Sequence, residues 1–213
     1  PTTEGVSCPA GPPWPRDFDY PAVWKPCDGA GSDGVRYIAR AESQVTPFAT
    51  RHGPPAVARV GRLERFYPGM AASVAVLCGP AGMTALAPCR QALSDDGRFH
   101  YLGGALPLEP RLAERAAKLA VEALATLPQA LGYLGVDLVL GPRDDGSADR
   151  VIEINPRLTT SYVGLRAACE SNLAETMLAI AQGQARTLAY RRECITFTAD
   201  GKVTIAACSS PGR

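Results

Sequence analysis

The segment Val151-Ile152-Glu153-Ile154-Asn155-Pro156-Arg157 decides the fold assignment, together with the earlier segment Gly135-Val136-Asp137-Leu138-Val139-Leu140. Both segments are apolar runs of strand length, and each carries acidic or amide residues among its apolar ones. The polar, glycine-containing stretch 141–150 separates them. Two strand-like runs joined by such a loop predict a β-hairpin.

Strand geometry predicts a cluster of oxygen-bearing side chains on this hairpin. Side chains alternate faces along a strand, so we expect one face to carry Val151, Glu153 and Asn155 and the other Ile152 and Ile154. An acid such as Asp137 within an apolar strand is costly unless something pairs with it. A single acid in a strand often faces solvent, but Glu153 and Asn155 two residues apart favour a functional set. Asp137, Glu153 and Asn155 together would suit Mg²⁺, which prefers oxygen ligands.

Size and charge restrict the classes of function. The chain has 213 residues, enough for one domain or two small lobes, and a net charge of +1. No dominant basic block is present, which argues against a nucleic-acid binder that depends on phosphate contacts. No apolar run approaches the length of a membrane span. We therefore expect small-molecule partners, with no nucleic acid and no membrane.

The cysteines and histidines do not suggest a metal or redox motif. The seven cysteines are an odd number, are scattered, and include no CxxC pair. A disulfide framework or a zinc site is therefore not expected, and several cysteines should be small buried apolar residues. This usage fits a reducing cytoplasm. His52 and His100 have no acidic or cysteine neighbours at ligand spacing, so we interpret both as surface or loop residues.

The remaining pattern predicts more strands than helices. Residues 1–21 are rich in proline and glycine and suggest a linker or extended arm. Strands are expected at 22–25, 35–39, 57–66, 72–78 and 83–87, and a hairpin at 193–207 that turns at Asp200-Gly201. Helices are expected from Pro110 along an apolar stripe to Leu127, at 161–169, and at 171–182 with Ser171 as N-cap. The predicted class is α+β.

A glycine-rich loop lies between the first two predicted strands. Residues 29–34 match GxGxxG, but the strand-like sequence 35–38 follows where a dinucleotide-binding motif needs a helix. A Walker A motif is absent. Such a loop can bend over phosphates and offer backbone N–H groups, with Lys25 supplying a positive charge. The alternative is an ordinary hairpin loop.

These parts, in this order, resemble the ATP-grasp superfamily of carboxylate–amine ligases. The match includes Val23-Trp24-Lys25-Pro26 with the glycine loop, a hinge-like segment 63–69, and the two metal-binding strands that end in Glu153-Ile154-Asn155-Pro156-Arg157. The segment 158–166 is similar to a subgroup that includes tyramine–glutamate ligase-like proteins. The resemblance covers nearly the whole chain and implies an ATP-grasp fold of two α+β lobes with the nucleotide between them.

The resemblance also implies a role for each matching residue. Asp137, Glu153 and Asn155 would hold Mg²⁺ against the phosphates of ATP, and Arg157 would steady the transferred phosphoryl group as the catalytic residue. Glu64 would accept a hydrogen bond from the adenine amino group. The remaining ATP contacts would come from Lys25, Gly29, Gly31, Ser32, Arg65 and Tyr67.

Two departures from the family pattern stand out. The stretch Met70-Ala71-Ala72 lacks the acid that often binds the ribose hydroxyls. The preceding α/β domain and an upstream phosphate-binding lysine are also missing from this sequence. On that pattern we expect the chain to be the carboxyl-terminal part of a longer enzyme.

The sequence-based hypothesis is a cytoplasmic, ATP- and Mg²⁺-dependent ligase module that joins a small-molecule carboxylate to an amine through an acyl phosphate. The expected division is an arm at 1–19, an amino lobe at 20–80 and a carboxyl lobe at 81–213 with its terminal hairpin. Arg90, Gln91 and the run 101–104 are candidates for an acceptor pocket, although a polar turn would explain them equally well. A non-catalytic nucleotide-binding remnant and an ATP-dependent phosphotransferase remain alternatives, and a homo-oligomer is one option for the assembly.

Overall fold

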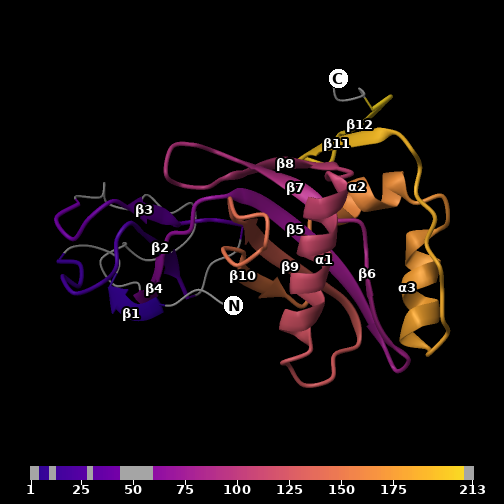
Figure 1. Ribbon diagram of the computed structural model, residues 1–213, viewed down its shortest axis with the longest axis horizontal. Coiled ribbons are helices and arrows are strands. Elements are labelled where there is room, and N and C mark those ends of the chain that lie inside the picture. The colour runs from indigo at the N-terminus through magenta and orange to yellow at the C-terminus, as the bar shows by residue number, and fades with distance from the viewer. Residues whose placement is uncertain (1–4, 10–12, 28–30, 44–59, 209–213) are drawn as a thin grey trace. The chain divides into compact units, whose positions relative to one another are not determined.

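The computed structural model describes residues 5–9, 13–27, 31–43 and 60–208 and has the predicted α+β composition (Figure 1). Its strands are β1 (Gly5–Pro9), β2 (Ala22–Pro26), β3 (Arg36–Ile38), β4 (Val60–Arg65), β5 (Met70–Gly79), β6 (Gly82–Ala85), β7 (Cys89–Leu93), β8 (Tyr101–Leu106), β9 (Gly132–Leu140), β10 (Arg150–Asn155), β11 (Cys194–Thr198) and β12 (Val203–Ala206). Its helices are α1 (Pro110–Leu124), α2 (Ser161–Ala168) and α3 (Leu173–Ala181). Within the described ranges, no helix has the length and apolar character needed to cross a membrane.

The chain forms two compact units. The larger unit contains residues 68–92 and the chain from Leu102 onward, and the smaller unit contains the chain up to Tyr67 together with 93–101. A sheet in the order β10-β9-β5-β7-β8-β11-β12, with β6 pairing β5, provides the framework of the larger unit. A four-stranded sheet in the order β1-β4-β2-β3 forms the smaller one.

Helix α1 covers one face of the large sheet, as the apolar stripe of its sequence predicts (Figure 1). Pro110 begins the helix, and the carboxylate of Glu109 accepts a hydrogen bond from the backbone N–H of Leu112 at 3.1 Å. The buried residues of α1 pack on alternate residues of β5 and β9. The members of this core are Ala116, Leu119, Ala120 and Leu124 from α1 with Ala72, Val74, Val76, Leu134, Val136 and Leu138 from the sheet.

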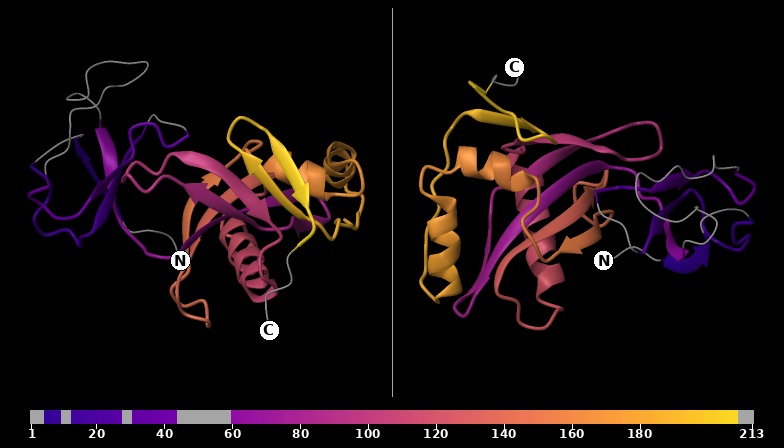
Figure 2. Two further views of the ribbon diagram at one scale, coloured as in Figure 1. Left: turned by 90° about the horizontal axis from the view of Figure 1, so that it is seen from above. Right: turned by 180° about the vertical axis from the view of Figure 1, so that it is seen from behind.

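The opposite face of the same sheet carries α3 (Figure 2). A Cβ added at Gly79 would lie 2.0 Å from the backbone oxygen of Ile180, so only glycine allows this close approach. Ser73, Ala75 and Leu77 have the same parity as Gly79 along β5 and therefore face the same way. This second face, away from α1, is also the face that carries Asp137, since Asp137 lies directly opposite Ser73.

The smaller unit buries one face of its four-stranded sheet around Trp24, Leu63 and Ile38, each with no exposed surface. The indole N–H of Trp24 donates to the carbonyl of Cys8 at 3.3 Å. Cys8 belongs to β1, which pairs with β4 along its whole length. The expectation of a linker or arm at 1–19 is therefore wrong for Gly5–Pro9. A short segment next to Pro and Gly can still complete a sheet edge, because strand pairing depends on the neighbouring strand as much as on local composition.

Three further local expectations need correction. The N-cap of α3 is Asn172 rather than Ser171, because the Asn172 side chain accepts from the N–H groups of Ala174 and Glu175. Strands β7 and β8 were not predicted. Cys194 and Cys208 form a disulfide, which the scattered cysteine spacing did not suggest. Four of the free cysteines that the structure describes are buried, as expected.

The predicted terminal hairpin is confirmed, and its pairing explains why residues 103 and 104 are glycines. Strand β11 pairs with β12 and also with β8, so that Phe197 lies opposite Gly104. Gly103 has a φ of 148°, and a Cβ there would lie 2.1 Å from the backbone oxygen of Phe197. These glycines are therefore required where β11 approaches β8.

Candidate functional site

The two predicted metal-binding strands form the predicted antiparallel hairpin, with a β-bulge that the sequence did not reveal. Asp137 on β9 lies opposite Glu153 on β10, and Asn155 lies opposite Gly135. The pairing shifts between Val151 and Glu153, which leaves Ile152 as the extra residue.

This bulge overturns part of the expected alternation. Val151 does not share a face with Glu153; it pairs with Leu138 and lies in the core under α1, where Ile154 also packs. An inserted residue resets the two-residue alternation of a strand, so residues before and after it exchange faces. Glu153 and Asn155 still share a face, and the bulge places that face on the side of Asp137.

Two side-chain amides hold the carboxylate of Asp137. The Nε2 of Gln91 donates to Oδ1 at 2.8 Å, and the Nδ2 of Asn155 donates to Oδ2 at 3.1 Å. The pKa of Asp137 is raised from 3.8 to about 6, first by burial and second by the negative charge of Glu153. The hydrogen bond from Gln91 and the charge of Arg157 oppose this rise in pKa.

Glu153 and Arg157 form the exposed side of this group, whereas Asn155 is buried. The Nη1 of Arg157 donates to the carbonyl of Leu158 at 3.3 Å. The structure thus brings together the four residues that the sequence predicted for the metal and the phosphoryl group. It adds Gln91, which the sequence suggested only for an acceptor pocket.

The chemistry of this group fits a hard cation. In the described part of the chain, neither Asp137 nor Glu153 makes a direct ion pair with a lysine or arginine. Like charges placed opposite one another on neighbouring strands are destabilising, and a divalent cation would remove this repulsion. No three His, Cys, Asp or Glu side chains gather into a metal cluster among the described residues. A cation here would therefore depend on the two carboxylates and the oxygen of Asn155.

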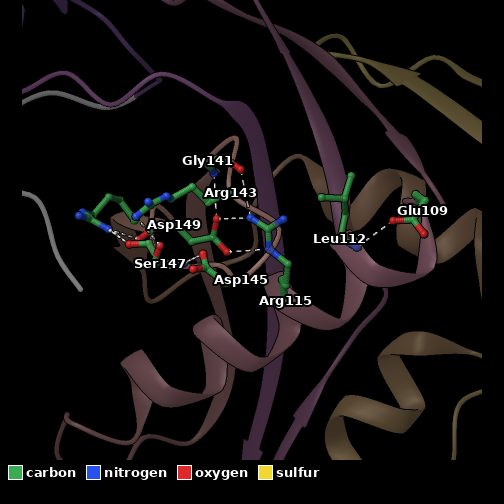
Figure 3. Close-up of polar contacts among 9 residues, drawn as sticks. Glu109, Leu112, Arg115, Gly141, Arg143, Asp145, Ser147 and Asp149 are labelled. Carbon is green, nitrogen blue, oxygen red and sulfur yellow. Dashed lines mark hydrogen bonds and ion pairs between the residues drawn. The ribbon is translucent and has the colours of Figure 1, made fainter.

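The turn end of the same hairpin contains a buried ion pair that the sequence analysis missed (Figure 3). The guanidinium of Arg115 on α1 donates to both oxygens of Asp149, at 3.1 and 2.5 Å, and to the carbonyl of Gly141 at 3.1 Å. The backbone N–H of Gly141 donates to Asp149 at 2.8 Å. Asp149 is 3% exposed. This network attaches the hairpin to α1 and holds the strands that carry the candidate metal ligands.

In the smaller unit, two residues predicted to contact ATP are paired with each other. The Nζ of Lys25 on β2 lies 2.9 Å from Oε2 of Glu64 on β4, and Arg62 Nε lies 3.4 Å from Oε1. Pairing of β2 with β4 sets Val23 opposite Glu64 and Lys25 opposite Arg62. These side chains therefore share the face of the sheet opposite that of Trp24.

The other predicted nucleotide contacts also lie in the smaller unit. Arg65 forms an ion pair with Asp19 at 2.6 Å, and its guanidinium lies 5.6 Å from the centre of the Tyr67 ring. Gly31 and Ser32 both have a φ of 64° in a turn that leads into β3. Gly29 lies outside the residues that the structure describes.

Two polar residues next to Asp137 carried signals that could have been recognised. Gln91 lies two residues after Cys89 on β7, so a period-two interpretation of Cys89–Leu93 places both on one face. Ser73 is the only hydroxyl in the apolar run of β5, and it lies opposite both Asp137 and Cys89. Its Oγ is buried and has no hydrogen-bond partner among the residues that the structure describes.

Curated relatives of this chain are ligases. The chain is 29% identical over 140 residues to the tyramine–L-glutamate ligase of Methanocaldococcus fervens, a match that covers 66% of this chain and 41% of the relative. The ligase of the same name from Methanocaldococcus jannaschii is 28% identical over 135 residues, with coverages of 63% and 41%. The chain thus matches less than half the length of these relatives.

Solved structures show the same fold. The L-amino acid ligase from Bacillus licheniformis gives a TM-score of 0.69 at 16% identity, covering 92% of this chain and 48% of that one. An N5-carboxyaminoimidazole ribonucleotide synthetase, solved as an ADP complex, gives 0.68 at 17% identity, with coverages of 93% and 52%. The MgADP complex of a biotin carboxylase domain from Hydrogenobacter thermophilus gives 0.65 at 15% identity, with coverages of 92% and 46%. The family model of the ATP-grasp domain matches residues 2–161, and this chain belongs to the ATP-grasp family.

Proposed function

We propose that this chain is the nucleotide- and Mg²⁺-binding part of a carboxylate–amine ligase that forms an amide through an acyl phosphate. One observation carries the proposal within an ATP-grasp chain: Asp137 and Glu153 oppose each other, without a lysine or arginine in a direct ion pair to either among the described residues. Two opposed carboxylates without such an ion pair are suited to binding a divalent cation.

The larger unit would supply the charge-bearing part of the site. Asp137, Glu153 and Asn155 would hold Mg²⁺, which neutralises charge on the phosphates when bound. Arg157 follows Asn155 by two residues, and its positive charge lowers the pKa of Asp137. Its guanidinium would steady an anionic phosphoryl group. Gln91 orients Asp137 through its 2.8 Å hydrogen bond.

The smaller unit would supply nucleotide contacts. Glu64 would accept from the adenine amino group, and the backbone at Arg65 and Tyr67 would contact the ring. Lys25, Gly31 and Ser32 would contact phosphate oxygens, together with Gly29. Glu64 and Lys25 are already paired at 2.9 Å, so a bound nucleotide would share or replace this ion pair.

The proposed reaction has two steps. A carboxylate oxygen attacks the γ-phosphorus of ATP, the bond to the β–γ bridging oxygen breaks, and ADP leaves. The amine nitrogen then attacks the acyl carbon, inorganic phosphate leaves with the former carboxylate oxygen, and the nitrogen gives one proton to solvent. Positioning of the reactants supplies much of the rate enhancement in such a reaction.

The test is trapping of an acyl phosphate. Because the curated relatives are named tyramine–L-glutamate ligases, L-glutamate is the first carboxylate and tyramine the first amine to try. The intact protein, incubated with ATP, Mg²⁺ and a carboxylate, should release ADP and form a hydroxamate when hydroxylamine replaces the amine. Glu153→Gln should abolish both signals, and the exposed Glu122→Gln on α1 should leave both unchanged.

Each alternative gives a different result in the same assay. ADP release with a stable phosphorylated product and no hydroxamate would indicate a phosphotransferase. Nucleotide binding without ADP release across a broad panel of carboxylates would indicate a non-catalytic module. Either result would contradict the ligase proposal.

A further inference from the structure

Ser73 occupies an unusual position beside the candidate metal site. It lies on β5 directly opposite Asp137 and is 3% exposed, yet its hydroxyl makes no hydrogen bond within the described part of the chain. Its other cross-strand neighbour, Cys89, directs its thiol to the carbonyl of Ala87 at 3.7 Å. A buried hydroxyl without a partner costs free energy, so a hydroxyl in this position next to a buried acid points to a partner in another state of the protein.

The orientation of Asn155 indicates what that other state is. Its Nδ2 donates to Oδ2 of Asp137 at 3.1 Å, so its amide nitrogen rather than its oxygen faces the carboxylate. A cation accepts only oxygen from an amide side chain. Ligation by Asn155 would therefore turn the amide and remove one of the two hydrogen bonds to Asp137, while the hydrogen bond from Gln91 to Oδ1 can persist.

We propose that the hydroxyl of Ser73 replaces the amide of Asn155 as hydrogen-bond donor to Asp137 when Asn155 turns its oxygen to a bound divalent cation. Ser73 is then a positioning residue: it keeps the carboxylate of Asp137 oriented while Asn155 changes partner. This inference rests on the proposed metal site and adds a residue with a different role, since the hydroxyl of Ser73 does not stabilise the metal-free protein.

That difference between the two states separates this role from ordinary packing. A serine that stabilises the fold would lower the melting temperature when it is replaced. An unpartnered serine should not, because removing its hydroxyl leaves no donor or acceptor unsatisfied. The effect of Ser73→Ala should therefore be confined to the cation-bound state.

The experiment measures Mn²⁺ binding in the presence of ADP by electron paramagnetic resonance, together with the melting temperature of the metal-free protein in EDTA. Ser73→Ala should weaken Mn²⁺ binding about tenfold, as expected for one hydrogen bond to a charged group. The same variant should leave the metal-free melting temperature unchanged or higher. Ser73→Thr, which keeps the hydroxyl, should bind Mn²⁺ within about threefold of wild type.

Thr176→Val is the matched control. The buried hydroxyl of Thr176 on α3 donates to the carbonyl of Asn172 at 3.1 Å, so its loss should lower the metal-free melting temperature and leave Mn²⁺ binding unchanged. Wild-type affinity in Ser73→Ala, with Mn²⁺ binding still abolished by Asp137→Asn, would overturn the role of Ser73 and leave the metal site intact. Mn²⁺ binding that Asp137→Asn does not affect, or none by wild type, would overturn the metal site itself and Ser73 with it.

Discussion

The turn and the strands of the β9–β10 hairpin hold a buried acid in opposite ways. At the turn, Asp149 receives both arms of the Arg115 guanidinium and a backbone N–H from Gly141. In the middle of the strands, Asp137 receives two side-chain amides and no guanidinium among the described residues, and it faces a second acid, Glu153. Both acids lie on the same small motif, so strand propensity does not explain the difference.

The comparison separates a structural acid from one that is prepared for a ligand. A buried carboxylate that pairs with a guanidinium has its charge compensated within the fold and needs no ligand. A buried carboxylate beside a like charge is held at a cost, and a cation would recover it. Glu64 in the smaller unit lies between these cases, because Lys25 and Arg62 pair with it while both remain partly exposed.

The largest expected effect comes from neutralising one of the two opposed acids, Asp137 or Glu153. Asp137→Asn or Glu153→Gln should lower Mg²⁺-dependent ADP release by the intact enzyme at least about 10³-fold, because a metal ion supplies several kcal/mol of charge stabilisation. Both variants should fold, since each removes one of two repelling charges. Steady-state ADP release with circular dichroism checks both points. Full turnover in both variants would contradict the metal-site assignment.

The next largest effect comes from removing the guanidinium of Arg115, which pairs with Asp149. Arg115→Met should lower the free energy of unfolding by about 3 kcal/mol, because Asp149 would remain buried without its cation. Urea denaturation measures this, and Asp149→Asn added to Arg115→Met should recover part of the loss. Lys118→Met, on an exposed part of α1, is the control and should change the free energy by less than about 0.5 kcal/mol. Equal stability of Arg115→Met and wild type would remove the basis of the comparison.

The pH dependence of the free energy of unfolding tests the environment of Asp137 in the metal-free protein. The folded-state pKa of Asp137 is raised from 3.8 to about 6, so the folded state holds this proton more tightly than the unfolded state does. The protonated Asp137 therefore stabilises the folded state relative to the unfolded state. This contribution to the free energy of unfolding is fully present below pH 3.8 and is lost as the pH rises through about 6, a change of roughly 3 kcal/mol.

The measurement is urea denaturation in EDTA between pH 4.5 and 7.5. Relative to Asp137→Asn, wild type should lose stability across this range. A second series with Mg²⁺ and ADP in place of EDTA should show a smaller loss, because the cation favours the ionised carboxylate. A difference between the two proteins that stays constant with pH would show that Asp137 titrates normally.

The smallest effect concerns the intermediate case in the smaller unit. Lys25→Ala should weaken ATP binding by about 1–3 kcal/mol, the range for a hydrogen bond to a charged group. Lys25→Arg should restore only part of this, because a planar guanidinium differs from a compact ammonium. Isothermal titration calorimetry provides the affinities, and an unchanged value for Lys25→Ala would count against the phosphate-contact assignment.

The sequence predicted those features that depend on local patterns. Alternation and turn residues located the β9–β10 hairpin and its three oxygen-bearing residues, and apolar periodicity located α1. The strand β1 and the strands β7 and β8 were missed, because their short segments contain polar, Pro or Gly residues and are stabilised by the strands beside them. The disulfide between Cys194 and Cys208 was missed because the pairing depends on how the terminal hairpin folds back.

The sequence by itself determined that Asp137, Glu153 and Asn155 lie on paired strands, since hydrophobic pattern and loop position specify which segments pair. Only the tertiary structure decided which other side chains lie beside them. The bulge at Ile152 set the face of Glu153, and pairing of β5 with both β7 and β9 brought Ser73 and Gln91 to Asp137 from strands more than 40 residues away along the chain. These contacts depend on the order of strands that are far apart in the sequence, and the packing of the whole sheet decides that order.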